Sequence, residues 1–179
     1  SRWQITSRPC SAKAMRAAIV GLTCMLAVPA GADGLERFGT TMKYALPLAA
    51  AVCAADQDRL EDFAVRGALQ AAVVLGLKAV FDGSPLGTRP TGEGRGFPSG
   101  HSAAAGFGAA DLAGKCWEDD PALGAAAYGA AGLTAFSRVQ AGEHTADQAL
   151  AGALIGISFG AASFGIGSEG AAISFGLRF

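Results

Sequence analysis

Five apolar segments of helical length follow one another in this sequence, and they limit the fold more than any other feature. Gly, Pro and charged residues separate them, and they occupy residues 42–55, 59–81, 101–115, 121–139 and 145 to about 166. Apolar segments of this length are typical of helices rather than strands. A chain of 179 residues makes one domain of ordinary size. The sequence therefore predicts a single all-α domain, a helical bundle.

Glycine marks two places within this bundle. Residues 82–97 hold five Gly and two Pro and are predicted to form a loop. In the last helical segment, Gly152, Gly156 and Gly160 recur every four residues. This spacing places them on one face, where another helix can approach closely.

The end of the sequence has a different pattern. Residues 173–179 alternate apolar with small or polar side chains and finish on Phe179, which is the period of a strand. We expect a short C-terminal β-strand that forms a docked tail, either on its own domain or on a partner.

The composition bounds the partners of the chain. It is 51% hydrophobic and 16% charged, with a mean hydropathy of +0.33, which favours association with a membrane or its surface. A net charge of −1 gives no broad positive field, so no nucleic-acid partner is expected. The composition does not indicate an oligomeric state.

The first 32 residues resemble an export signal. Lys13 and Arg16 precede an apolar run at 17–28, and small residues at 30–32 fit a cleavage site near Ala32. We expect a start at Met15, an upstream extension before it, and one domain over residues 33–179. The alternative is an uncleaved anchor helix. Either way we expect a bacterial envelope protein, periplasmic or membrane-associated after export.

Two cysteines, Cys53 and Cys116, lie in the expected mature chain. They could form a disulfide in an oxidising compartment, although two buried free thiols are slightly favoured. No Cys and His cluster has the spacing of metal ligands, so neither a metal nor a cofactor is predicted.

The two histidines of the chain each lie in a short motif of phosphate-binding residue types. His101 follows Pro98, Ser99 and Gly100, whereas His144 follows Ser137 and Arg138 and is followed by Asp147. Ser99, Gly100 and His101 begin a predicted helix, where free N–H groups and the helix dipole favour an anion. One neutral histidine could attack phosphorus while the other, protonated, donates to the leaving group.

Three cations accompany these motifs: Lys78 closes the second helical segment, Arg89 lies in the glycine-rich loop, and Arg138 precedes His144. Phosphoryl transfer needs cations around the equatorial oxygens of phosphorus. The sequence thus contains the parts of a phosphate site. Asp111 and Glu143 are expected to be solvent-facing charges.

These motifs together resemble the type 2 phosphatidic acid phosphatase superfamily, which also contains bacterial acid phosphatases and vanadium-dependent haloperoxidases. Lys78 with Arg89-Pro90 matches its first motif, Pro98 to His101 its second, and Ser137-Arg138 with His144 its third. The resemblance spans about residues 75–156. It implies a helical bundle with the active site at the helix ends.

The resemblance also implies a role for each residue. His144 would be the nucleophile that forms a phosphohistidine, and His101 the general acid. Phosphate would be held by Lys78, Arg89, Ser99, Gly100 and Arg138. An acidic partner would orient His144.

The chain departs from the family pattern at two points. Ten residues separate Lys78 from Arg89, where the family usually has about six, so residues 82–87 look like an insertion. The second departure is at the acidic partner: Gln148 occupies the aligned position, and Asp147 is one residue early. Both lie on the side of a helix that faces His144, so either could be its partner. We expect Asp147 to be the acidic catalytic residue that partners His144.

The resulting hypothesis is a metal-independent phosphatase that acts on phosphate monoesters, with lipid phosphates such as phosphatidic acid favoured by the apolar composition. The first alternative is a non-catalytic phosphate-binding envelope protein. A vanadate-dependent haloperoxidase using the same residues is a further alternative.

Overall fold

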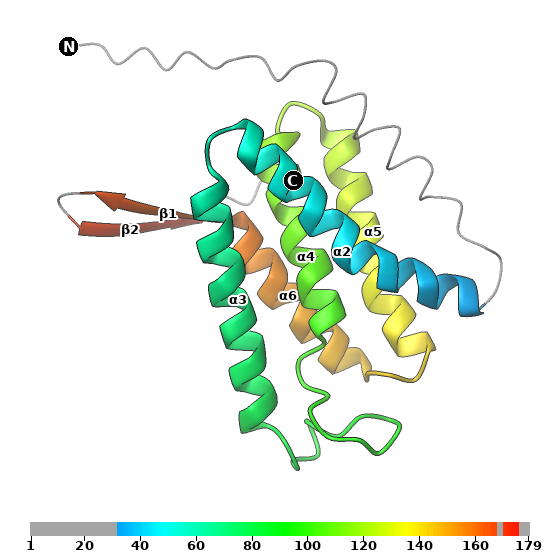
Figure 1. Ribbon diagram of the computed structural model, residues 1–179. Helices are drawn as coiled ribbons and strands as arrows, with labels where there is room; N and C mark the ends of the chain where they lie inside the picture. The colour runs from blue at the N-terminus through cyan, green and yellow to red at the C-terminus, as the bar shows by residue number, and fades with distance from the viewer. Residues whose placement is uncertain (1–31, 168–169, 176–179) are drawn as a thin grey trace, which may run out of the picture.

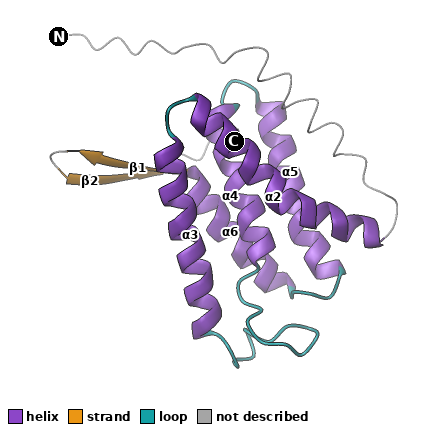
Figure 2. Cartoon of the chain, viewed as in Figure 1, coloured by secondary structure: helices purple, strands orange, loops and turns teal. Residues whose placement is uncertain are grey.

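The computed structural model describes residues 32–167 and 170–175, which form five α-helices, one π-helical turn and two short strands (Figures 1 and 2). In order, these are α2 (Ala32–Asp56), α3 (Leu60–Val80), α4 (Gly100–Asp111), η1 (Leu112–Cys116), α5 (Pro121–Gln140), α6 (Ala146–Ala161), β1 (Ala162–Gly167) and β2 (Gly170–Phe175). The predicted all-α bundle is confirmed. Apart from Ala32, the expected N-terminal extension and signal peptide lie outside the described residues.

Helix α2 begins earlier than expected, at Ala32 rather than at residue 42. Its buried face explains the extension, because an apolar residue recurs every fourth position. This stripe is formed by Phe38, Met42, Leu46, Ala50 and Ala54, all at most 5% exposed. It packs into the main core with side chains of α4 and α5.

Helix α4 lies at the centre of the bundle, against α2, α5 and α6 (Figure 1). Helix α6 contacts it through the predicted glycine face. A Cβ atom at Gly152, Gly156 or Gly160 would overlap the backbone oxygen of Ser99, Ala103 or Phe107, respectively. The two backbones therefore touch along three turns, as the glycine spacing predicted.

Helix α6 ends at Ala161, about five residues before its expected end, and the chain continues as an antiparallel hairpin. Ala162 of β1 pairs with Phe175 of β2. The predicted C-terminal strand is present, but it pairs with β1, and the hairpin extends away from the helices in Figure 1. Residues 176–179 of the expected strand lie outside the described residues, so the docking of this strand stays a prediction.

Cys53 at the end of α2 and Cys116 in η1 form a disulfide, with their Cα atoms 6.2 Å apart. The slight preference for free thiols was therefore wrong, because two segments 63 residues apart in sequence fold side by side. The bridge lies at the end of the bundle where α4 finishes.

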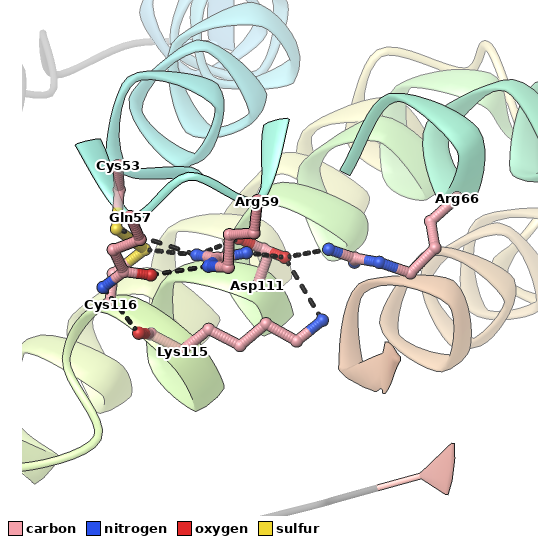
Figure 3. The surroundings of a disulfide bond; sticks show 7 residues. All are labelled: Cys53, Gln57, Arg59, Arg66, Asp111, Lys115 and Cys116. Atoms are coloured by element: carbon pink, nitrogen blue, oxygen red, sulfur yellow. Dashed lines mark hydrogen bonds and ion pairs between the residues drawn. A yellow bond between two sulfur atoms is a disulfide. The ribbon is translucent and has the colours of Figure 1, made fainter. Parts of the chain in front are cut away.

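A buried ion-pair cluster adjoins this disulfide (Figure 3). Asp111 is fully buried and contacts Arg59, Arg66 and Lys115 at 3.1, 2.6 and 3.4 Å. The expectation that Asp111 faces solvent was wrong. Arg66 and Lys115 also donate to the Gly160 carbonyl at 3.1 Å each, so the cluster satisfies acceptors at the end of α6.

Large apolar side chains remain exposed on the outer faces of α3 and α6. These exposed side chains include Leu69, Leu75 and Val80 on α3 and Leu150 and Leu154 on α6, which are between 46% and 75% exposed. Among the described residues, α3 alone is long and apolar enough to cross a membrane by length and composition.

Candidate active site

The three sequence motifs meet at the end of the bundle opposite the disulfide. There α3 and α5 finish, α4 and α6 begin, and the loop between α3 and α4 folds over them (Figures 1 and 2). The site residues come from these ends: Lys78 from α3, Arg89 from the loop, Ser99 to His101 from the start of α4, Arg138 from α5 and His144 from the turn before α6. The motif residues therefore gather at the helix ends, where the resemblance implied an active site.

His144 is 4% exposed, and its Nδ1 lies 3.1 Å from Oε1 of Gln148, one helical turn further along. The same oxygen accepts from the Thr145 backbone N–H at 3.2 Å. Thr145 in turn caps the Gln148 backbone N–H, so the two residues form a capping box at the start of α6. Local helix-capping chemistry thus turns Gln148 toward His144.

The amide nitrogen of Gln148 fixes which way its side chain points. Nε2 donates to the carbonyl oxygens of Leu86 and Thr88, both at 2.9 Å. Oε1 must then be the acceptor, so His144 carries its proton on Nδ1. This tautomer leaves Nε2 of His144 with a free lone pair, as a nucleophile requires.

Of the two alternatives for the partner of His144, Gln148 contacts its ring and Asp147 does not. Gln148 is fully buried, whereas the side chain of Asp147 is exposed. The reason is the capping box, which needs the third residue of the helix to face inward, and that residue is Gln148. The expectation that Asp147 partners His144 is not met.

His101 contacts a residue that the sequence motifs do not include. Its Nε2 lies 2.9 Å from Nζ of Lys43, which belongs to α2. An ammonium can only donate, so Nε2 of His101 accepts and the neutral ring carries its proton on Nδ1. A doubly protonated ring has no acceptor for this contact.

Both histidines favour the neutral form. Burial lowers the pKa of His101 from 6.5 to about 4, with further lowering by Lys43, Arg138, His144 and Arg89. Burial also lowers the pKa of His144; the hydrogen bond with Gln148 opposes this effect, and the charges of Arg89, Lys78 and Arg138 add to it. Burial and the nearby cations therefore disfavour the protonated member of the expected pair, one neutral and one protonated histidine.

Within the described ranges, two arginines of the site hold buried donors without hydrogen-bond partners. Arg138 is 5% exposed, and neither its Nε nor its Nη1 has such a partner; the same holds for Nε of Arg89. Carboxylates lie nearby: Glu143 accepts a hydrogen bond from Nη1 of Arg89 at 3.3 Å, and Arg138 has Glu36 and Glu143 at ion-pair distances of 3.5 and 3.7 Å. Buried N–H groups without partners are costly and rare.

Lys78 stays with the site despite the longer first motif. Its Nζ donates to the Arg95 carbonyl at 2.7 Å, which ties α3 to the loop. Burial, with the charges of Arg89 and Arg95, lowers the pKa of Lys78 from 10.5 to about 8. The extra residues are accommodated by the loop and do not remove the lysine.

Ser99 and Gly100 differ in what they can offer a ligand. Ser99 is fully buried, and its hydroxyl accepts from Ser102 N–H and Oγ at 3.4 and 3.1 Å, so it serves as the cap of α4. A Cβ at Gly100 would meet nothing within 4 Å. There is open space beside the backbone at Gly100, where the helix N-terminus favours an anion.

Sequence reasoning missed Lys43, Glu36 and the pairing role of Glu143. The first two come from α2, far from the motifs in sequence, and no pattern links them to the site. Within the described part of the chain, no three His, Cys, Asp or Glu side chains gather so that they could hold a metal ion.

The comparison with protein families agrees with this arrangement. A family model described as the PAP2 superfamily matches residues 68–169, more than half of the chain. The matched range holds all three motifs but not α2. No curated protein and no solved structure matches the chain.

Proposed function

The chain belongs to the PAP2 superfamily, whose members are phosphatases generally, and we propose that it hydrolyses phosphate monoesters through a phosphohistidine at His144. The single observation that carries this proposal is that buried guanidinium nitrogens, Nε of Arg89 and both Nε and Nη1 of Arg138, have no hydrogen-bond acceptor among the described residues. A phosphate dianion offers several acceptor oxygens, and charge-assisted bonds from arginine to phosphate are among the strongest in proteins. Lys78 adds a third cation to this site, and the open space beside Gly100 leaves room for the phosphate at the start of α4.

The proposed reaction has two steps. Nε2 of His144 forms a bond to phosphorus while the bond from phosphorus to the alcohol oxygen breaks, and His101 supplies the proton that this oxygen takes up. In the second step the oxygen of water bonds to phosphorus while the bond from phosphorus to Nε2 of His144 breaks. The water gives its proton to His101, and inorganic phosphate leaves. Arg89 and Arg138 stabilise the charge on the equatorial oxygens throughout.

Lipid phosphates, such as phosphatidic acid, are the substrate class we favour. Exposed apolar side chains lie close in sequence to the site residues: Leu75 and Val80 flank Lys78, and Leu150 follows His144 by less than two turns. An apolar surface beside a phosphate site suits a headgroup presented by a membrane. The disulfide supports an oxidising compartment such as the bacterial envelope.

One observation favours a second candidate, a protein that binds phosphate without turnover. Gln148 holds His144 through a neutral amide, which orients the ring but cannot stabilise an imidazolium as a carboxylate does. The two candidates share the same phosphate site.

Phosphate release from an aryl phosphate and from phosphatidic acid vesicles, without added metal, tests the proposal. We expect the full chain to release phosphate, His144→Ala to lose at least about a thousandfold in rate, as triad members do, and Asp147→Asn to change little because that side chain is exposed. Binding of inorganic phosphate without release from either substrate would favour the second candidate. A His144→Ala variant as active as the parent would overturn the phosphohistidine.

A further inference from the structure

We propose that Lys43 is a positioning residue of this site, which fixes the tautomer of His101 and keeps its ring neutral until an anion enters. The catalytic consequence of this inference rests on the proposed function. The contact itself is independent of that function: Nζ of Lys43 lies 2.9 Å from Nε2 of His101.

The position of Lys43 is set by close packing of α2 on α5. A Cβ at Gly39, one turn before Lys43, would overlap Oγ of Ser137. Arg138, next to Ser137 on α5, lies 3.5 Å from Glu36 of α2. Helix α2 thus lies directly beside the phosphate site, although it is outside the range that matches the family.

The surroundings of Lys43 do not neutralise its charge. In the described ranges, no carboxylate lies within ion-pair distance of its ammonium, which instead lies 4.6 Å above the Tyr44 ring and donates to His101. A half-buried cation without an anionic partner is more stable when an anion is bound nearby.

The other charged and titratable groups around His101 act in the same direction. Arg138 of α5, Arg89 of the loop and His144 before α6 all disfavour a second proton on this ring. Lys43 differs from them because it also occupies the Nε2 lone pair. It therefore controls both where the proton is on the neutral ring and how readily a second one is added.

Binding of a phosphate would favour the protonated form of His101. Its negative charge offsets the surrounding cations and attracts the ammonium, so protonation of His101 becomes easier only when substrate is present. The general acid would be formed by substrate binding, and an empty site would not hold an acidic proton.

The chain has only two histidines, so imidazole ¹⁵N NMR can follow each of them, with His144→Asn assigning the remaining signal to His101. We expect Lys43→Met to raise the pKa of His101 by about one unit or more, as removal of an adjacent like charge does. Lys43→Gln should raise the pKa as well but keep the proton on Nδ1, since its amide can still donate. Lys43→Arg should keep both properties.

Arg37→Met is the matched control, because it removes an exposed cation from the same helix and should leave His101 unchanged. Inorganic phosphate should raise the pKa of His101 in the parent chain. An equal His101 pKa in the parent, Lys43→Met and Arg37→Met would overturn the proposal. Lys43→Gln addresses the same question with a polar side chain if the methionine variant does not fold.

The pH dependence of kcat/KM separates this inference from the proposed function. If His101 is the acid, the falling limb should move to higher pH in Lys43→Met, whereas a merely structural defect would lower the rate equally at every pH. An NMR shift without phosphate release would retain the role of Lys43 and reject the catalytic function. Phosphate release without an NMR shift would support the catalytic function and reject the role of Lys43.

Discussion

The Gln148 side chain connects three parts of the site through one amide. Its oxygen accepts from His144 and from the Thr145 backbone, and its nitrogen donates to Leu86 and Thr88 in the loop that carries Arg89. Leu86 lies within residues 82–87, the expected insertion in the first motif. The two departures from the family pattern therefore meet at one place, since the longer loop supplies carbonyl groups that only a donor can satisfy.

This geometry makes an acid at position 148 unfavourable. In Gln148→Glu a carboxylate oxygen would face the two loop carbonyls, so we expect a loss of about 1–3 kcal/mol in the free energy of unfolding and weaker phosphate binding. Urea unfolding at pH 7 and phosphate titration would measure both. Asp147→Asn, on the neighbouring exposed residue, is the control. A glutamate variant with parental stability and higher activity would show that the amide is dispensable.

At this scale the sequence predicted the residue types of the site but not all of their partners. His101, His144, Lys78, Arg89 and Arg138 are found from short motifs, because each motif is local. The contact of Lys43 with His101, those of Asp111 with Arg59 and Arg66, and those of Gln148 with the loop carbonyls join elements far apart in the chain. They depend on helix packing that no local pattern encodes.

The packing of α6 on α4 depends on glycine at Gly152, Gly156 and Gly160. In Gly156→Ala the new methyl group would meet the Ala103 carbonyl, which is backbone and cannot move aside. We expect a loss of about 1–3 kcal/mol in stability, measured by thermal or urea unfolding. Gly132→Ala is the matched control, since a Cβ there meets nothing within 4 Å, and helix propensity should stabilise it by about 0.5–1 kcal/mol. Equal effects of the two substitutions would contradict this account.

The helices themselves were predicted well, and their ends less so. Apolar length located all five helices, and Asp120 with Pro121 gave the start of α5, where the Asp120 carboxylate accepts from Ala122 and Leu123 N–H. The start of α2 was missed because charged residues interrupt its first turns, although the four-residue stripe beginning at Phe38 was present. Ala- and Gly-rich sequence gave no sign that α6 ends at Ala161.

The whole molecule has two polar ends joined by the central helix α4. One end holds the proposed phosphate site, and the other holds the disulfide and the buried Asp111 cluster (Figure 3). Arg59 links the bridge to this cluster, because it contacts Asp111 and lies 3.2 Å from Sγ of Cys116. The cluster and the bridge hold the ends of α2, α4 and α6 in place away from the site.

Removal of the disulfide should therefore affect stability more than chemistry. Closing a loop of 63 residues stabilises the folded chain by about 4 kcal/mol in the chain-entropy account. We expect the double variant Cys53→Ser and Cys116→Ser to lose a large part of this in urea unfolding while binding phosphate as the parent does at low temperature. Unchanged stability, or selective loss of phosphate binding, would contradict this separation of the two ends.

The glycine contact between α4 and α6 has a consequence for how the sequence can diverge. His101 lies in the first turn of α4 and His144 two residues before α6, so the spacing of the two rings follows from the fit of one backbone on another. It does not depend on the volumes of the alanine-rich core around them. Most core positions can therefore drift among small apolar residues without moving the histidines, whereas the three glycines should resist exchange almost as strongly as the histidines themselves.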